Sequence, residues 1–278
     1  MNTTQMETTL PKDMVAMLCK YAPAVFGTPA ETVSNRYVYV PTFKVLELLL
    51  KENFYISKAT QTGKDEHSRH VIRLRKDEDG KWGRAVYQSE DVGTIIPEIV
   101  LSNSHNAKST FQIYMGLFRL VCKNGMTALS SETQKSTIKH LGSPEAVVNS
   151  VITTAETLPM IMNDVKTFAQ IQLAPEEQAA YAEAAIPLRW SSETHKNIPK
   201  PEDLLTIRRK EDKNNDLWST FSRIQENMTK GGVAYRGQDM RRSRIRDIKS
   251  ATEDLRLNKS LWALTQKMAE IKQSGDLC

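Results

Sequence analysis

The feature that most limits the fold is a pair of short strand patterns separated by one polar stretch. Phe54–Ala59 and His70–Lys76 are rich in apolar and β-branched residues, and Thr60–Arg69 between them is polar. Two such segments pair most simply as an antiparallel hairpin, because a parallel pairing needs a longer crossover connection. The chain is therefore expected to contain an antiparallel sheet.

Charge alternates with apolar character along the second of these strands. Arg73 separates Ile72 from Leu74, and Arg75 and Lys76 follow. Successive side chains of a strand point to opposite faces of its sheet. The pattern therefore predicts one buried face and one solvated, cationic face.

The strand patterns continue along the chain. Ile95–Leu101 predicts another strand, in which Pro97 indicates an edge position or an irregularity. Apolar residues alternate again from Phe111, as a strand or a strand-to-helix transition. Turn signals lie at Asp77–Gly83 and Asn124–Gly125. We expect the sheet to be formed mostly between residues 36 and 128.

Helical periodicity flanks this region on both sides. Met14 to Tyr21 carry apolar residues at helical spacing, and Thr42 is expected to be the N-cap of a second helix. Later helical patterns occur at Val147–Lys166, Pro175–Ala185, Leu217–Met228 and Leu257–Ile271. The predicted class is α+β: an antiparallel β-meander with flanking helices, plus a helical basic C-terminal region.

The chain length allows one large domain or two small ones. We predict an α+β sheet domain over residues 1–130 and a helical segment packing on it over 131–190. A linker over 191–202 follows, since SSETHKNIPKPED is polar and contains proline. The helical basic C-terminal region then covers 203–278.

Targeting and membrane signals are not found in the sequence. No apolar run is long enough to span a bilayer, and MNTTQMETTLPKDM has no signal-peptide pattern. Three distant cysteines, Cys19, Cys122 and Cys278, suit a reducing compartment. We expect a cytoplasmic protein with no membrane partner.

The stretch from Ser102 to Met126 combines a histidine, a cysteine, an arginine and several hydroxyls, as an active site does. Cys122 is flanked by apolar residues, however, which predicts an inert core position. His67 and His70 have no further ligands at metal-site spacing, and Asp77–Asp79 is typical of an acidic turn. Glycine-rich phosphate-binding motifs are also missing. We expect no enzyme activity, no cofactor and no metal.

Polar residues at the start of this stretch are candidates for binding. Asn103, His105 and Asn106 lie in a predicted turn, where exposed polar side chains often contact partners. The apolar residues from Phe111 to Val121 are expected to fill the core.

The basic residues give the most informative signal. The net charge is +5, and YRGQDMRRSRIRDIK supplies most of the excess, with six cations against two acids. Smaller clusters lie at residues 73–76 and 208–210. The predicted nucleic-acid-binding residues are Arg73, Arg75, Lys76, Arg208, Arg209, Tyr235, Arg236, Arg241, Arg242, Arg244, Arg246 and Lys249.

Two interpretations of these clusters stay open. Guanidinium forks bind phosphate oxygens in a bidentate geometry, and Tyr235 would stack on bases. Alternatively, the arginines form a solvated charged face or pair with acids across a subunit interface.

Several segments together resemble a known family. They are SNRYVYVPT, HVIRLR, PEIVLSNSHNAKSTFQIYMGLFRLVCKNGM, DLWSTFSRIQENMTKGG, RRSRIR and LNKSLW. The family consists of phage/plasmid-like proteins of unknown function carried by plasmids, prophages and integrative elements, with close relatives in Escherichia coli prophages. The resemblance covers nearly the whole chain and implies no catalytic residue.

Residence on a mobile element implies a part in replication, recombination or survival of host defence. The first hypothesis is a DNA-binding recombination factor that anneals single-stranded DNA as a homo-oligomer, in a ring or filament. The N-terminal order of elements resembles Rad52-type single-strand annealing proteins. Such a protein would hold the DNA backbone without sequence specificity and leave the bases free to pair.

Two other functions are possible. The second hypothesis is an anti-defence protein that binds a host restriction or interference complex. The third is an enzyme such as a nuclease, which the scarcity of acid–histidine groupings disfavours.

Overall fold

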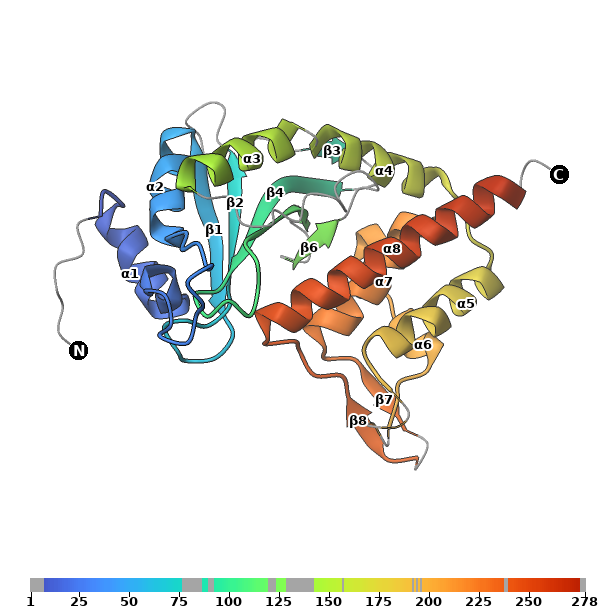
Figure 1. Cartoon of the computed structure of the whole chain (residues 1–278). Helices are drawn as coiled ribbons and strands as arrows, with labels where there is room; N and C mark the ends of the chain where they lie inside the picture. Colours follow the sequence, from blue (N-terminus) through green and yellow to red (C-terminus); the bar gives the residue numbers. More distant parts are fainter. Residues whose placement is uncertain are drawn as a thin grey trace. The chain divides into compact units, whose positions relative to one another are not determined.

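The computed structural model describes residues 8–76, 87–89, 93–119, 124–128, 143–156, 158–191, 193, 195, 197–237 and 240–275 (Figure 1). The chain divides into two compact units, and each unit draws on three separate stretches. Unit 1 comprises Met1–Ala85, Pro97–Gly116 and Ser130–Leu158, and unit 2 comprises Val86–Ile96, Leu117–Leu129 and Pro159–Cys278. The predicted turn at Asp77–Gly83 and the predicted core residues Val121 and Cys122 lie outside the described residues.

The strands form the antiparallel meander that the sequence predicts. Their order in the sheet is β1 (Phe54–Gln61), β2 (His70–Lys76), β4 (Gly93–Asn103), β5 (Gln112–Arg119) and β6 (Asn124–Ala128), and β3 (Tyr87–Ser89) pairs with β4. The hairpin of β1 and β2 is antiparallel, with Phe54 opposite Lys76 and Gln61 opposite His70. The α+β class is thereby confirmed.

Pro97 lies at an irregularity of β4. This strand pairs with β3 through Gly93–Ile95 and with β2 through Ile99–Asn103, so Pro97 falls between the two registers. The position suits proline, which has no N–H to donate to a ladder. The predicted turn at Asn124–Gly125 is wrong, since both residues belong to β6. Sheet neighbours override local turn propensity here.

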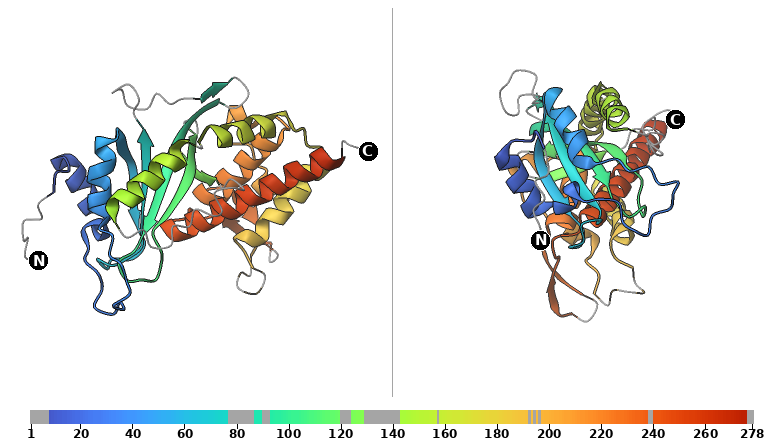
Figure 2. Two further views of the ribbon diagram at one scale, coloured as in Figure 1. Left: turned by 45° about the horizontal axis from the view of Figure 1, so that its top comes forward. Right: turned by 60° about the vertical axis from the view of Figure 1, so that its left-hand side comes forward.

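Unit 1 packs three helices on the β1–β2 hairpin: α1 (Lys12–Tyr21), α2 (Thr42–Lys51) and α3 (Pro144–Glu156). A short 3-10 helix, Pro23–Phe26, follows α1. Figure 2 shows α2 and α3 beside the hairpin. Their shared core includes Leu18, Leu46, Leu49, Phe54, Ile72, Leu74, Leu101 and Val151. These contacts remove a large apolar area from water, which is the main favourable term in folding.

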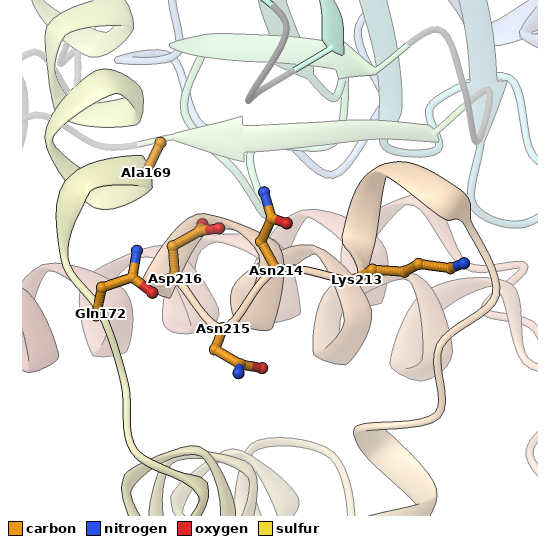
Figure 3. Close-up of a pocket in the computed structure, with 6 residues that line it drawn as sticks. All are labelled: Ala169, Gln172, Lys213, Asn214, Asn215 and Asp216. Atoms are coloured by element: carbon orange, nitrogen blue, oxygen red, sulfur yellow. The ribbon is translucent and has the colours of Figure 1, made fainter.

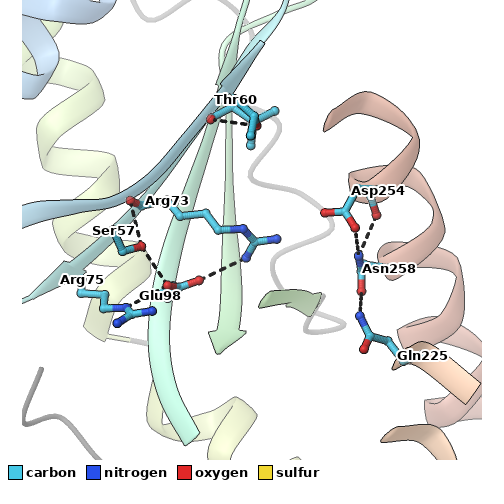
Figure 4. Close-up of polar contacts among 9 residues, drawn as sticks. Ser57, Thr60, Arg73, Arg75, Glu98, Gln225, Asp254 and Asn258 are labelled. Atoms are coloured by element: carbon cyan, nitrogen blue, oxygen red, sulfur yellow. Dashed lines mark hydrogen bonds and ion pairs between the residues drawn. The ribbon is translucent and has the colours of Figure 1, made fainter. Parts of the chain in front are cut away.

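The prediction that β2 has a solvated cationic face is wrong. Arg73 is buried, and its Nη1 donates to Oε2 of Glu98 at 3.2 Å. Nε of Arg75, which is 16% exposed, donates to Oε1 of the same carboxylate at 2.9 Å, and Ser57 donates to it at 2.9 Å (Figure 4). Because β2 lies between β1 and β4, Glu98 on β4 can neutralise both arginines.

A pair of buried histidines joins α2 to the sheet. Nε2 of His70 lies 2.8 Å from the hydroxyl of Thr42, which also accepts from Asn103 at 3.0 Å. The prediction that Thr42 is the N-cap of α2 is wrong. Pro41 is the N-cap, and Thr42 is the first residue of the helix, with its side chain buried. The His105 ring centroid lies 5.2 Å from that of His70 and 5.2 Å from that of Tyr39.

Burial keeps these histidines neutral. Desolvation, together with the neighbouring His105, lowers the pKa of His70 to about 3, and desolvation lowers the pKa of His105 to about 4. The expectation that Asn103 and His105 are exposed turn residues is wrong, since both are buried; Asn106 is half-buried.

Unit 2 is built on α7 (Leu217–Lys230) and α8 (Ala251–Gly275), which pack against each other. Around them lie α4 (Leu158–Gln170), α5 (Pro175–Ala185), α6 (Pro201–Leu204) and two short 3-10 helices, Ile186–Leu188 and Lys210–Asp212. The predicted helical stretch Val147–Lys166 is therefore divided between α3 and α4. None of the described helices is both long and apolar enough to cross a bilayer.

The buried face of α8 differs from the predicted one. Leu257 and Leu261 are buried as expected, but Ile271 is 54% exposed. The buried stripe also includes Leu255, Asn258, Trp262, Thr265 and Ala269. Because Asn258 and Thr265 are polar, the sequence does not indicate that they belong to the buried stripe. Both are tolerated there because their side chains are hydrogen-bonded.

Replacing Glu98 by Gln tests the role of the arginines on β2. We expect a loss of about 3 kcal/mol in the free energy of unfolding, because two partly desolvated guanidinium groups lose their shared carboxylate. Urea denaturation measures this, with Glu31→Gln as a control at an exposed acid. Equal stability of the two variants would contradict a structural role for the cluster.

The histidine pair predicts acid lability. The unfolded chain takes up protons below its ordinary histidine pKa near 6.5, whereas the folded chain does so only near the lowered values. Stability is therefore complete above about pH 6.5 and falls toward pH 4, by about 2 kcal/mol per histidine at pH 5.

Urea denaturation at pH 7 and pH 5 measures this loss. His105→Phe should remove about half of the pH dependence, since its ring cannot titrate. His195→Gln, at an exposed histidine, should leave the dependence unchanged. A pH response of His105→Phe equal to that of the parent would refute the assignment.

Candidate nucleic-acid interface

Helix α7 is buried along its whole length, although more than half of its side chains are polar. Its polar residues bind the neighbouring elements of unit 2. Gln225 donates to Asn258 of α8 at 2.8 Å, and Asn258 in turn donates to Asp254 (Figure 4). Asn227 donates to the carbonyl of Leu204, the last residue of α6, and to that of Thr206 just after it. These bonds fix the helices around α7.

The end of α7 sets the path of the next segment. Gly231 has a φ of 62° at the C-cap, a left-handed conformation that favours glycine. A Cβ atom at Gly231 would lie 2.5 Å from the backbone of Arg246, so the chain passes too closely for any side chain. Two hydrogen bonds then begin a ladder, Gly232 N–H to Ile245 O at 2.7 Å and Ile245 N–H to Val233 O at 2.9 Å.

The ladder continues as a two-stranded antiparallel ribbon, β7 (Ala234–Arg236) and β8 (Arg242–Arg244), which we call the arginine ribbon. Arg236 lies opposite Arg242, and Ala234 lies opposite Arg244. Directly opposed residues share a face, so the three arginines line one side. All three are exposed, whereas Val233, Tyr235 and Ile245 are buried. In Figures 1 and 2 the ribbon projects from the helices of unit 2.

Arginine and aromatic side chains fasten the base of the ribbon to the helices. Arg189 donates to the carbonyl of Met228 near the end of α7, and to that of Arg246 after β8 at 2.7 Å. The Tyr235 hydroxyl donates to the carbonyl of Asn197 at 3.2 Å. The arginine face is therefore presented on a fixed backbone.

The exposed arginines of the ribbon form no ion pair within the part of the chain that the structure describes. Within the described residues, no ion pair or side-chain hydrogen bond involves the guanidinium groups of Arg236, Arg242 or Arg244. Like charges directly opposite each other destabilise a strand pair. This face is a candidate anion-binding surface, because a bound anion would reduce the repulsion between Arg236 and Arg242.

A polar pocket of about 340 Å³ lies against this face. It is lined by Lys200, Asp203, Ala234, Tyr235, Arg236 and Arg242. Three of the six residues are cationic, and the acid, Asp203, already accepts from the backbone N–H of Lys200 at 2.8 Å. The pocket has room for a phosphate group.

The other predicted binding residues serve different roles. Arg209 donates to Glu226 of α7 at 2.7 Å, and Arg208 donates to the carbonyl of Gly231 at 2.8 Å, so both hold α7. Tyr235 lines part of the pocket against the arginine face, but it is only 8% exposed and its register places its side chain on the other side of the ribbon, which leaves little ring surface for stacking on bases.

The remaining predicted residues divide between the two units. Arg73 and Arg75 are bound to Glu98 in unit 1, and Lys76 is exposed at the end of β2. Arg241, Arg246 and Lys249 are exposed near the ribbon in unit 2. The arginine ribbon itself went unrecognised in the sequence, although apolar residues at 233, 235 and 245 alternate with the arginines.

A second polar pocket, of about 490 Å³, lies before α7 (Figure 3). Its lining residues are Ala169, Gln172, Lys213, Asn214, Asn215 and Asp216. The Asp216 carboxylate is already used as the N-cap of α7, accepting from the Ser219 N–H at 2.7 Å and from its hydroxyl at 2.8 Å. No cluster of metal ligands occurs in the described part of the chain. The pocket is lined mainly by amide side chains and by a carboxylate that already caps α7. The arginine ribbon is therefore the stronger candidate for a binding site.

Comparison with known proteins matches most of the chain to a family. Residues 29–262 match the family model described as Domain of unknown function (DUF932). The chain is 34% identical to UPF0380 protein YafZ and 33% identical to UPF0380 protein YfjQ, both of Escherichia coli strain K12. Each match extends over 261 residues, 90% of this chain and 89% of the relative.

No solved structure matches the chain. The similarity to Rad52-type annealing proteins is not shown by these comparisons and stays a prediction. The family resemblance is confirmed, because the model covers most of the sequence and both compact units. The protein belongs to the DUF932 family.

Proposed function

We propose that this protein binds the phosphate backbone of DNA, without sequence specificity, on the arginine ribbon. The observation that carries the proposal is the pairing of Arg236 opposite Arg242, exposed and without an ion pair among the described residues. Guanidinium groups bind phosphate oxygens in bidentate geometry, and phosphate contacts dominate non-specific affinity. The protein would act in the cytoplasm, where the DNA of a mobile element is accessible.

The buried position of Tyr235 disfavours a binding mode in which DNA bases stack on its ring. Many single-strand binders stack bases on exposed aromatic rings, and the arginine face offers none among its described residues. Backbone contacts without stacking leave base edges free. This suits a single-strand annealing factor, which must hold a strand and still let it pair with its complement.

Fluorescence anisotropy with a labelled oligo-dT strand and a labelled duplex tests the proposal. The variant Arg236→Gln/Arg242→Gln/Arg244→Gln removes three exposed cations without removing a described contact. We expect at least about a tenfold loss of affinity at low salt. The slope of log K against log salt should fall by about 2 to 3, close to one counterion per lost phosphate contact.

A control variant of equal charge makes the test specific. Lys12→Ala/Lys51→Ala/Lys64→Ala removes three exposed cations from unit 1. It should bind DNA nearly as the parent does, and all three proteins should melt at similar temperatures. The proposal fails if the parent shows no binding at 50 mM salt or if the two variants bind equally.

Annealing is a separate expectation. With two complementary strands carrying a fluorescence donor and acceptor, the parent should accelerate pairing and form large homo-oligomeric assemblies on single strands, visible by mass photometry. The ribbon variant should do neither, because both require the bound backbone. DNA binding without acceleration would leave the backbone proposal intact and exclude annealing.

A further inference from the structure

The tip of the arginine ribbon carries an exposed apolar side chain. Met240 is 66% exposed, more than any other large apolar residue that the structure describes as exposed. It stands directly before Arg241 and Arg242, at the start of β8. Single exposed apolar side chains are common on protein surfaces, so Met240 draws interest only together with the neighbouring arginines and its own backbone conformation.

The backbone at this residue is strained. Met240 has a φ of 58°, in the left-handed region that glycine and asparagine tolerate best. Its N–H donates to the Gly237 carbonyl at 3.0 Å, and the Gly237 N–H donates to the Arg241 carbonyl at 3.2 Å, so two hydrogen bonds tie this end of β8 to Gly237. Methionine here costs free energy that glycine would not, and strain of this kind gathers at functional sites.

Cations and the apolar tip together suggest how the ribbon meets DNA. We propose that Met240 is a wedge that enters between neighbouring bases while Arg236, Arg242 and Arg244 hold the phosphates. Apolar side chains, methionine among them, are used in this way by proteins that unstack base steps. The flexible thioether adapts to irregular gaps between bases. This inference rests on the proposed function, since the arginines must first bind the backbone.

The wedge gives the ribbon a second chemical function. Phosphate contacts alone carry no means of separating stacked bases. A side chain that opens a base step would expose base edges, which favours the exchange of one pairing partner for another. Backbone binding would supply the affinity, and Met240 would supply the distortion.

The experiment uses DNA with 2-aminopurine between two adenines, as a single strand and as a duplex. Stacking quenches this base, so unstacking raises its fluorescence. The full-length parent should raise the signal in at least one of the two forms at saturation. Met240→Leu should retain the rise, and Met240→Gly should lose it while binding the DNA within about threefold of the parent, because phosphate contacts supply most of the affinity.

Stability measurements separate the wedge from a structural role. Met240→Gly should melt at the same or a higher temperature than the parent, since glycine relieves the left-handed strain. A fluorescence rise that survives in Met240→Gly, or a parent that binds without any rise, would overturn the wedge and leave backbone binding intact. Absence of DNA binding by the parent would instead refute the proposed function.

An anionic vesicle of phosphatidylglycerol and phosphatidylcholine serves as the competing ligand. Basic ribbons with an apolar tip also suit lipid surfaces. Vesicle binding that requires Met240, together with an unchanged 2-aminopurine signal, would overturn the wedge in favour of a membrane contact.

Discussion

The polar side chains of α7 are the constraint on which unit 2 depends. A buried amide or carboxylate left without a partner costs about 1–3 kcal/mol, more than a typical net hydrogen bond contributes. Gln225, Asn227 and Glu226 each find a partner on a different neighbour: α8, the end of α6, and Arg209. Each bond therefore fixes one neighbouring element against α7. The segment that follows α7 in the chain starts from a fixed point for the same reason.

The arginine ribbon is a product of this arrangement. Its first strand starts directly after α7, where Gly231 allows the chain to turn beside the backbone of Arg246. Arg189 then holds both ends of the turn through two carbonyl groups. The repulsion between Arg236 and Arg242 is tolerated because the opposite face buries Val233, Tyr235 and Ile245. Because the backbone is held, an anion that bound here would have to order only the arginine side chains.

Short-range patterns in the sequence predict the strands of the hairpin and most helices well. β2 matches its predicted bounds, and α5 matches as well, because alternation and helical periodicity are local. The roles of Arg73 and Arg75 could not be predicted in this way. Their partner Glu98 is more than twenty positions away in the chain and becomes a neighbour only through sheet pairing.

The candidate site shows the same division. The concentration of arginines after residue 235 marks the candidate segment in the sequence, since charge is visible without a fold. The strands of the ribbon are only three residues long and are too short to give a clear periodic signal in the sequence. The side on which Tyr235 lies depends on the pairing of these strands, which the sequence alone does not define. The polar residues of the buried α8 stripe, Asn258 and Thr265, hid that face for a related reason: their partners lie on α7 and α5.

The interleaving of the two compact units has a consequence for the inheritance of the gene. Unit 1 takes residues from before and after segments of unit 2, so no single cut in the chain separates them. A crossover between residues 86 and 158 would therefore join pieces of both units from different parents, and both cores would have to match at once. Exchange of one whole unit would need several crossovers, because the stretches of unit 1 alternate with those of unit 2 along the chain.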